Sequence, residues 1–128
     1  MRHAIHWFEI PTSNLDRAVK FYEQALSLTL KHEVFSEIAM AIFPATESGN
    51  LANDGVPGAL VLDPRRQPSA HGSLVYLNAL PDLDAVLARV PMAGGRVIMS
   101  KTDIGPPGFI AIIEDTEGNV VGLHIPRP

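Results

Sequence analysis

The chain has 128 residues, of which 46% are hydrophobic and 19% are charged, and these proportions are typical of a globular protein with a buried core. Its formal net charge is −4 and it has no basic cluster, so we expect neither nucleic acid nor a membrane surface as a partner. Cysteine is absent, which excludes disulfides, thiol catalysis and thiolate metal sites. No apolar run reaches membrane-spanning length and no apolar leader is present, so we expect a cytoplasmic protein.

The first half of the sequence predicts one strand, one helix and three further strands. Short runs of apolar and β-branched residues between turn signals place the strands at residues 5–10, 28–34, 37–43 and 58–62. Apolar residues recur at helical spacing from Leu15 to Leu26, which predicts an amphipathic helix of about three turns. We expect Ser13 to cap this helix, with Asp16 in the capping-box position. The polar stretch 44–57 is predicted to be a loop.

The second half repeats this order of elements. Asp82 is the expected N-cap of a second helix, and Gly94-Gly95 is expected to end it. The strands of this half are predicted at residues 74–79, 97–99, 109–113 and 120–125. The two helix starts align at an offset of about 68 residues, which suggests two copies of one β-α-β-β-β unit. The alternative is an ordinary α+β domain without duplication.

We therefore predict an α+β fold of paired β-α-β-β-β modules in a single domain, residues 1–128. Module 1 spans about 1–63, a linker spans 64–71, and module 2 spans about 72–126. A mostly antiparallel sheet can bury one face under its helix and leave the other free. Two modules side by side would then form an incompletely closed sheet around one cleft, where a ligand is expected to bind.

The last two predicted strands are joined by a tight turn, Asp115-Thr116-Glu117-Gly118-Asn119. Gly118 and Asn119 tolerate the positive φ that such turns require, so this stretch predicts a hairpin. A loop rich in glycine and proline, 104–108, precedes the hairpin. We expect Asp115 and Glu117 to stabilise the turn and to take no part in chemistry.

Taken together, these features resemble the vicinal-oxygen-chelate superfamily, which contains the glyoxalases, the bleomycin-resistance proteins and the extradiol dioxygenases. In the first half the resemblance is carried by Trp7-Phe8-Glu9-Ile10-Pro11, Leu15-Asp16-Arg17-Ala18 and Phe21-Tyr22. In the second half it is carried by Gly94-Gly95, Lys101-Thr102, Gly108-Phe109 and Asp115-x-Glu117-Gly118-Asn119. The chain is most similar to a glyoxalase-related bacterial branch with a Phe-Glu-Ile-Pro strand and a Gly-Leu-His ending.

The resemblance also implies where a metal would bind. Metal enzymes of the family carry histidine and glutamate ligands on strand positions that face the cleft, because imidazole and carboxylate supply the donor atoms. The matching positions here are Trp7, then Ser73 or Leu74, and Gly122, and the strand 58–62 holds no acid or imidazole. We therefore expect no metal site and no other cofactor.

Two residues are candidates for catalysis. Glu9 is predicted in the middle of the first strand on the cleft face, and His124 shares the face of Gly122 in the last strand. A carboxylate and an imidazole in one cleft could transfer a proton as an acid–base pair. The alternatives are a structural carboxylate satisfied by neighbouring donors and a histidine satisfied at its strand end.

Five residues are candidates for binding a ligand. Trp7 offers a flat face for stacking, or it fills the core. Tyr76 and Asn78 alternate with apolar residues and are expected to face the cleft, whereas the opposite register would bury Tyr76 under the helix. Lys101 could reach an anionic ligand at the cleft mouth or be solvated, and Phe109 could line either the pocket or the core.

Two functions follow from the sequence and its resemblance. The first is a small-molecule binding protein of the bleomycin-resistance type that works without the family metal. The alternative is a glyoxalase-type lyase or isomerase, or a dioxygenase-related enzyme. The resemblance also implies a homodimer, because family members often pair their modules across a dimer.

Overall fold

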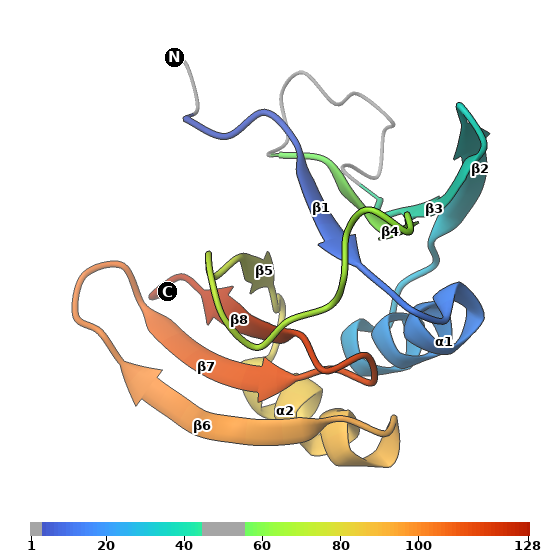
Figure 1. The fold of residues 1–128 in the computed structure, drawn as a ribbon. Coiled ribbons are helices and arrows are strands. Elements are labelled where there is room, and N and C mark those ends of the chain that lie inside the picture. Colours follow the sequence, from blue (N-terminus) through green and yellow to red (C-terminus); the bar gives the residue numbers. More distant parts are fainter. Residues whose placement is uncertain (1–3, 45–55) are drawn as a thin grey trace.

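The computed structural model describes residues 4–44 and 56–128, and it contains the β-α-β-β-β order twice (Figure 1). Module 1 consists of β1 (Phe8–Pro11), α1 (Leu15–Leu26), β2 (Lys31–Phe35), β3 (Ile38–Ile42) and β4 (Gly58–Leu62). Module 2 consists of β5 (Tyr76–Asn78), α2 (Leu83–Met92), β6 (Arg96–Asp103), β7 (Phe109–Glu114) and β8 (Val120–Ile125). The predicted α+β class and the two modules are confirmed. The loop predicted at 44–57 lies almost entirely outside the described residues.

Each module forms its own four-stranded mixed sheet. Sheet A has the strand order β1-β4-β3-β2, and sheet B has the order β5-β8-β7-β6. In each sheet the first pair, β1 with β4 or β5 with β8, is parallel, and the other two pairs are antiparallel. The sheets do not close into a barrel, as predicted, and β1 and β5 are each an edge strand of their own sheet.

The strand boundaries differ from prediction where local patterns are weak. β1 begins at Phe8 and not at residue 5, and Pro11 is its last residue, which is tolerated because β1 is an edge strand. β5 is limited to three residues, whereas β6 extends from Arg96 to Asp103 through two register shifts. The polar end of β6 lacks the apolar alternation by which the sequence identifies strands.

The expected cap of α1 is wrong by one residue. Asn14 is the N-cap, and its side-chain oxygen accepts a hydrogen bond of 3.0 Å from the backbone N–H of Arg17. The hydroxyl of Ser13 instead donates to the carboxylate of Glu117, at 3.1 Å. Glu117 lies in the turn between β7 and β8, so no local pattern around the helix could have indicated this partner.

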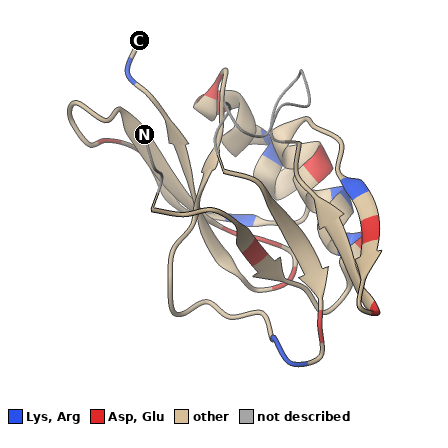
Figure 2. Cartoon of the chain, turned by 90° about the horizontal axis from the view of Figure 1, so that it is seen from above, with Lys and Arg blue, Asp and Glu red and all other residues tan. Residues whose placement is uncertain are grey.

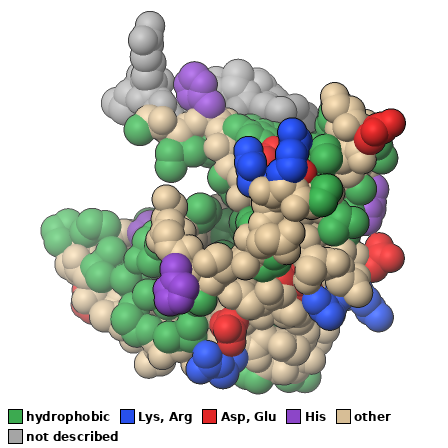
Figure 3. Space-filling model, in the orientation of Figure 1, with side chains coloured by type: hydrophobic (Ala, Val, Ile, Leu, Met, Phe, Trp, Pro, Cys, Tyr) green, Lys and Arg blue, Asp and Glu red, His purple; other side chains and the backbone are tan. Residues whose placement is uncertain are grey.

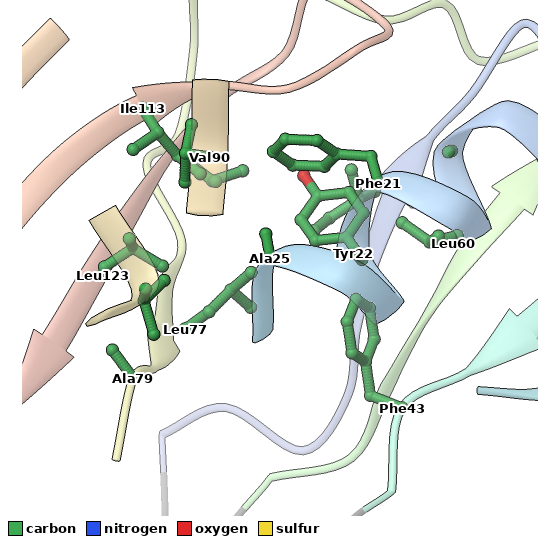
Figure 4. Close-up of a cluster of buried hydrophobic side chains, with 14 of the residues drawn as sticks. Phe21, Tyr22, Ala25, Phe43, Leu60, Leu77, Ala79, Val90, Ile113 and Leu123 are labelled. Carbon is green, nitrogen blue, oxygen red and sulfur yellow. The ribbon is translucent and has the colours of Figure 1, made fainter. Parts of the chain in front are cut away.

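The two helices pack against each other and share one apolar core with both sheets (Figure 4). Tyr22 is fully buried, and its ring meets those of Phe21 and Phe43 edge-on, with centroid distances of 4.9 and 5.6 Å. The other labelled members of this core are Ala25, Leu60, Leu77, Ala79, Val90, Ile113 and Leu123. Each sheet therefore turns one face to the helices and leaves the other face free of them.

The β7–β8 turn joins module 2 to module 1. The Tyr22 hydroxyl donates to the Asp115 carboxylate at 2.6 Å, which satisfies a polar group inside the core. The Asn119 amide donates to the Pro11 carbonyl at 2.7 Å, and its oxygen accepts from the backbone N–H of Ser69 at 3.0 Å. Asp115 therefore stabilises its own turn, as predicted, and also accepts a hydrogen bond from the first helix.

Candidate ligand-binding site

Three of the residues predicted to form the site meet on the free face of sheet B. Tyr76 and Asn78 lie on β5, opposite Gly122 and His124 of the parallel strand β8. Together with their neighbours they line a hollow of about 680 Å³, which we name the sheet-B hollow. Its lining residues are Tyr76, Leu77, Asn78, Leu80, Ile104, Ile110, His124 and Pro126.

The strand around Tyr76 has the register that keeps its polar groups outside the core. Leu77 is buried in the core, while 44% of the Tyr76 surface is exposed. Asn78 is likewise exposed. The alternative register, with Tyr76 under the helix, is not found, because it would bring the Asn78 amide into the apolar layer.

The polar groups of the hollow have defined hydrogen-bonding roles. His124 Nε2 lies 2.8 Å from the carbonyl oxygen of Pro107. A carbonyl oxygen only accepts, so Nε2 carries the proton of this bond, and Nδ1 of the neutral ring is then an acceptor. The Asn78 side-chain oxygen accepts from the backbone N–H of Leu80 at 2.8 Å, which leaves its amide N–H groups to donate. The hollow can thus offer a ligand both a donor and an acceptor.

Glu9 lies on β1 of the other sheet, and Trp7 lies just before this strand. The Trp7 indole N–H donates to the Glu9 carboxylate at 3.1 Å, and both residues are exposed. Glu9 lines a smaller cavity of about 190 Å³ together with His71 of the linker. The structure therefore does not bring Glu9 and His124 into one cavity within the chain, and an acid–base role for the two residues stays a prediction.

Lys101 and Phe109 lie on the helix side of sheet B. Lys101 Nζ is 3.3 Å from a carboxylate oxygen of Asp84 on α2 and 4.8 Å from the Phe109 ring centroid. The Phe109 ring also packs against the core and has the Arg127 guanidinium 4.7 Å from its centroid. Neither residue lines the sheet-B hollow. A lysine already paired with a carboxylate is poorly placed to attract an anionic ligand, and the binding role of Lys101 stays a prediction.

The residues at the family's metal positions do not fit a metal ion. A Cβ atom added at Gly122 would lie 2.3 Å from the Tyr76 ring, so the aromatic ring fills the space of a carboxylate ligand. Within 4–44 and 56–128, no group of three or more His, Asp or Glu side chains is arranged to hold a metal.

Besides Leu77, sequence reasoning missed four apolar residues that line the hollow, which are Leu80, Ile104, Ile110 and Pro126. One of them could have been found, because Ile110 pairs with His124 across the β7–β8 ladder and so shares its face. The others lie in loops and near the end of the chain, where no periodicity indicates which way a side chain points.

Over the residues that the structure describes, Lys and Arg are scattered along the cartoon and form no extended basic stretch (Figure 2). Figure 3 shows a recess between the upper and lower halves of the molecule, with hydrophobic side chains at its back. In the part of the chain that the structure describes, no helix is long and apolar enough to cross a membrane.

Two mycobacterial proteins match most of this chain. Both are called "Putative glyoxylase CFP32", one from Mycobacterium bovis and one from Mycobacterium tuberculosis, and each is 29% identical over 122 residues. The match covers 95% of this chain but 44% of the relatives, so the chain spans less than half of their length.

Solved structures show the same fold. TnmS3, an antibiotic-binding protein from Streptomyces sp. CB03234, has a TM-score of 0.64 and 28% identity, and the match covers 99% of this chain and 98% of TnmS3. A glyoxalase/bleomycin resistance protein from the same organism has a TM-score of 0.64 and 27% identity, over 95% of this chain and all of its own. A glyoxalase I mutant from Zea mays has a TM-score of 0.66 and 18% identity, and the match covers 92% of this chain and 44% of the maize chain. At this identity the likeness shows the fold alone.

The family is shown by a match over nearly the whole described chain. Residues 4–123 match the family described as "Glyoxalase/Bleomycin resistance protein/Dioxygenase superfamily". That range begins before β1 and ends inside β8, so it includes both modules. The chain therefore belongs to the glyoxalase/bleomycin resistance protein/dioxygenase superfamily.

Proposed function

We propose that the protein binds a small organic molecule in the sheet-B hollow, without the metal that enzymes of the family use. The observation that carries this proposal is the convergence of Tyr76, Asn78 and His124 on one hollow of about 680 Å³. Cavities of this size, with apolar walls and a few polar groups, are typical of small-molecule sites. The relationship to TnmS3, which binds an antibiotic, supports an organic ligand of similar kind.

The lining indicates how such a ligand is held. An aromatic part of the ligand stacks on the exposed Tyr76 ring, while the Asn78 amide donates to it and His124 Nδ1 accepts from it. Leu80, Ile104 and Ile110 contribute apolar contacts. No Lys, Arg, Asp or Glu is among the described residues that line the hollow, so hydroxyl, carbonyl or amide groups suit it better than permanent charges.

We further propose that the protein is a homodimer in which sheet A of one chain covers the sheet-B hollow of its partner. The face of sheet A turned away from α1 carries the apolar cluster Met40, Ala59 and Val61. On the same side, 55% of Phe35 and 41% of Trp7 are exposed, which favours burial in an interface. Such a pairing would bring the Trp7–Glu9 pair to the ligand, where Trp7 would stack on it and Glu9 would accept a hydrogen bond.

Sedimentation velocity tests the dimer. We expect a dimer for the wild-type chain and a monomer for Phe35→Glu, because a charge in an apolar interface opposes association. Val34→Glu is the matched control, since Val34 is also exposed but points to the opposite side of its strand. A monomeric wild-type chain would contradict the dimer and leave the hollow of the single chain as the site. Equal effects of both substitutions would contradict the proposed interface.

A thermal-shift screen with aromatic natural products tests the binding function. A compound that stabilises the protein is then titrated against Asn78→Ala and against His124→Ala. We expect each substitution to weaken binding about tenfold, which corresponds to about 1.4 kcal/mol. Lys101→Ala is the control, because Lys101 lies on the other side of sheet B. Unchanged affinity in both site variants would contradict the assignment.

A further inference from the structure

A second cavity lies on the opposite, helix side of β5. It has a volume of about 610 Å³, and its walls come from β5, from the segment before β5, from the start of β1 and from the end of α1. We name it the helix-side cavity. Its lining residues are Ile5, Phe8, Leu26, Leu28, Phe43, Pro44, Val56, Ser73, Leu74, Val75, Tyr76, Leu77 and Asn78.

The helix-side cavity is separate from the sheet-B hollow. Phe8 and Phe43 pack against the core that the two helices share, and their ring centroids are 5.7 Å apart. Leu26 is the last residue of α1 and Leu28 follows the helix, and both pack on the same core. The two cavities have only the short strand β5 in common, so this strand forms a wall between them.

No charged side chain lines the helix-side cavity in the part of the chain that the structure describes, although charged residues make up 19% of the sequence. Its polar side chains are Ser73 and Asn78, together with the Tyr76 hydroxyl. A charged ligand would lose its hydration here and find no opposite charge in return. The described lining of the cavity therefore favours an uncharged molecule.

Large apolar side chains at this cavity remain exposed to water. Ile5 is 57% exposed and Leu74 is 38% exposed, and both line the cavity and not the sheet-B hollow. Covering such surface with an apolar molecule removes it from water, which favours binding. Because apolar walls enclose the space on several sides, a compact molecule would gain contacts that a flat surface could not give.

We propose that the helix-side cavity is a second binding site, which takes an uncharged, largely apolar small molecule such as an aromatic hydrocarbon derivative. One hydroxyl or amine of that molecule would hydrogen-bond to Ser73, which does not line the sheet-B hollow. The two cavities share β5, but Leu74 lines only this cavity and His124 lines only the sheet-B hollow, so either proposal can fail without the other.

The neutral fluorescent dye N-phenyl-1-naphthylamine tests this site, because its emission rises when it moves from water into an apolar environment. We expect one dye to bind per chain, and we expect Leu74→Glu to weaken binding at least tenfold by placing a carboxylate in the uncharged cavity. Leu62→Glu is the matched control, since Leu62 is 40% exposed and lines none of the three cavities described above. The control is expected to bind the dye with wild-type affinity.

Three results would overturn the proposal. The first is the absence of dye binding to the wild-type protein, and the second is equal affinity in Leu74→Glu and wild type. The third is a loss of affinity on Leu80→Glu in place of Leu74→Glu, because Leu80 lines only the sheet-B hollow. Far-ultraviolet circular dichroism and the melting temperature of each variant show that the fold is kept, and Ile5→Glu repeats the test at a second exposed position of the same cavity.

Discussion

Glu117 and Arg17 join the last turn of the chain to its first helix, with Glu117 Oε2 lying 2.6 Å from Arg17 Nε. The same carboxylate accepts from the backbone N–H groups of Ser13 and Asn14, at 2.9 and 2.8 Å, at the start of α1. Burial alone raises the pKa of Glu117, but the hydrogen bonds from Arg17, Asn14 and Ser13 outweigh it and lower the pKa to about 2. The turn thus anchors module 2 on module 1.

Glu117→Gln is expected to destabilise the protein by about 2 kcal/mol at pH 7, because a buried charge-assisted hydrogen bond is lost. The folded-state pKa lies below the ordinary value of 4.5, so the carboxylate stabilises the fold above pH 4.5 and loses this effect as the pH falls toward 2. Urea denaturation at several pH values should therefore show the variant and wild type converging in this range.

Glu114→Gln is the matched control for that experiment. Glu114 pairs with Arg96 at 3.2 Å, but the pair is largely exposed, and surface pairs contribute below about 1 kcal/mol. If Glu117→Gln destabilised the protein no more than Glu114→Gln, the anchoring role of Glu117 would be refuted.

Tyr22→Phe should reduce the free energy of unfolding by about 1–3 kcal/mol, because the Asp115 carboxylate loses a buried donor at 2.6 Å. Burial first, and then the charge of Asp115, raise the pKa of Tyr22 well above its model-compound value of 10.0. Its contribution to stability is therefore complete below pH 10 and is lost as the pH rises further. Stability measured between pH 8 and 11 should fall in the wild type and fall less steeply in Tyr22→Phe; parallel curves would disprove the coupling.

Ser27→Gly should stabilise the protein by about 1 kcal/mol. Ser27 ends α1 in the left-handed region, with φ 55° and ψ 55°, where glycine is favoured because it lacks a Cβ atom. Ser27→Ala is the control, because alanine is strained there as serine is. Thermal unfolding should give the glycine variant a higher melting temperature than the serine and alanine proteins. No gain from glycine would mean that Ser27 is not strained at the end of the helix.

Gly122→Ala should destabilise the protein by about 1–3 kcal/mol and weaken ligand binding, because the added Cβ would lie 2.3 Å from the Tyr76 ring. In a Tyr76→Ala background the same substitution should have little effect on stability. A double-mutant cycle measures this coupling directly. Additive effects of the two substitutions would show that the Tyr76 ring does not occupy the space at Gly122.

Most of the fold could be predicted because local patterns and tertiary contacts agree. β4 and β8 have the predicted bounds, and the Asp82 side chain caps α2 as expected, accepting from the backbone N–H of Ala85. The alternation of polar and apolar residues in β5 predicted which of its side chains face the core, since only one register keeps Asn78 out of the core. The order of helices and strands in both modules could be predicted from the same kind of local pattern.

The site was harder to predict because it depends on how elements far apart in sequence meet. Phe109 starts a strand that is apolar at every position up to Ile113, so alternation could not show which residues face the core. Glu9 and His124 each lie on the face of their strand that the sequence pattern indicates. They nevertheless line different cavities, because the two modules pack against each other through their helices. No local pattern encodes that packing.

The most direct test of the proposed function is an NMR titration of the ¹⁵N-labelled protein with the compound selected by thermal shift. We expect the largest chemical-shift changes at Tyr76, Asn78 and His124, with saturation at one ligand per chain. Changes confined to the helix side of sheet B, around Lys101 and Phe109, would contradict binding in the sheet-B hollow.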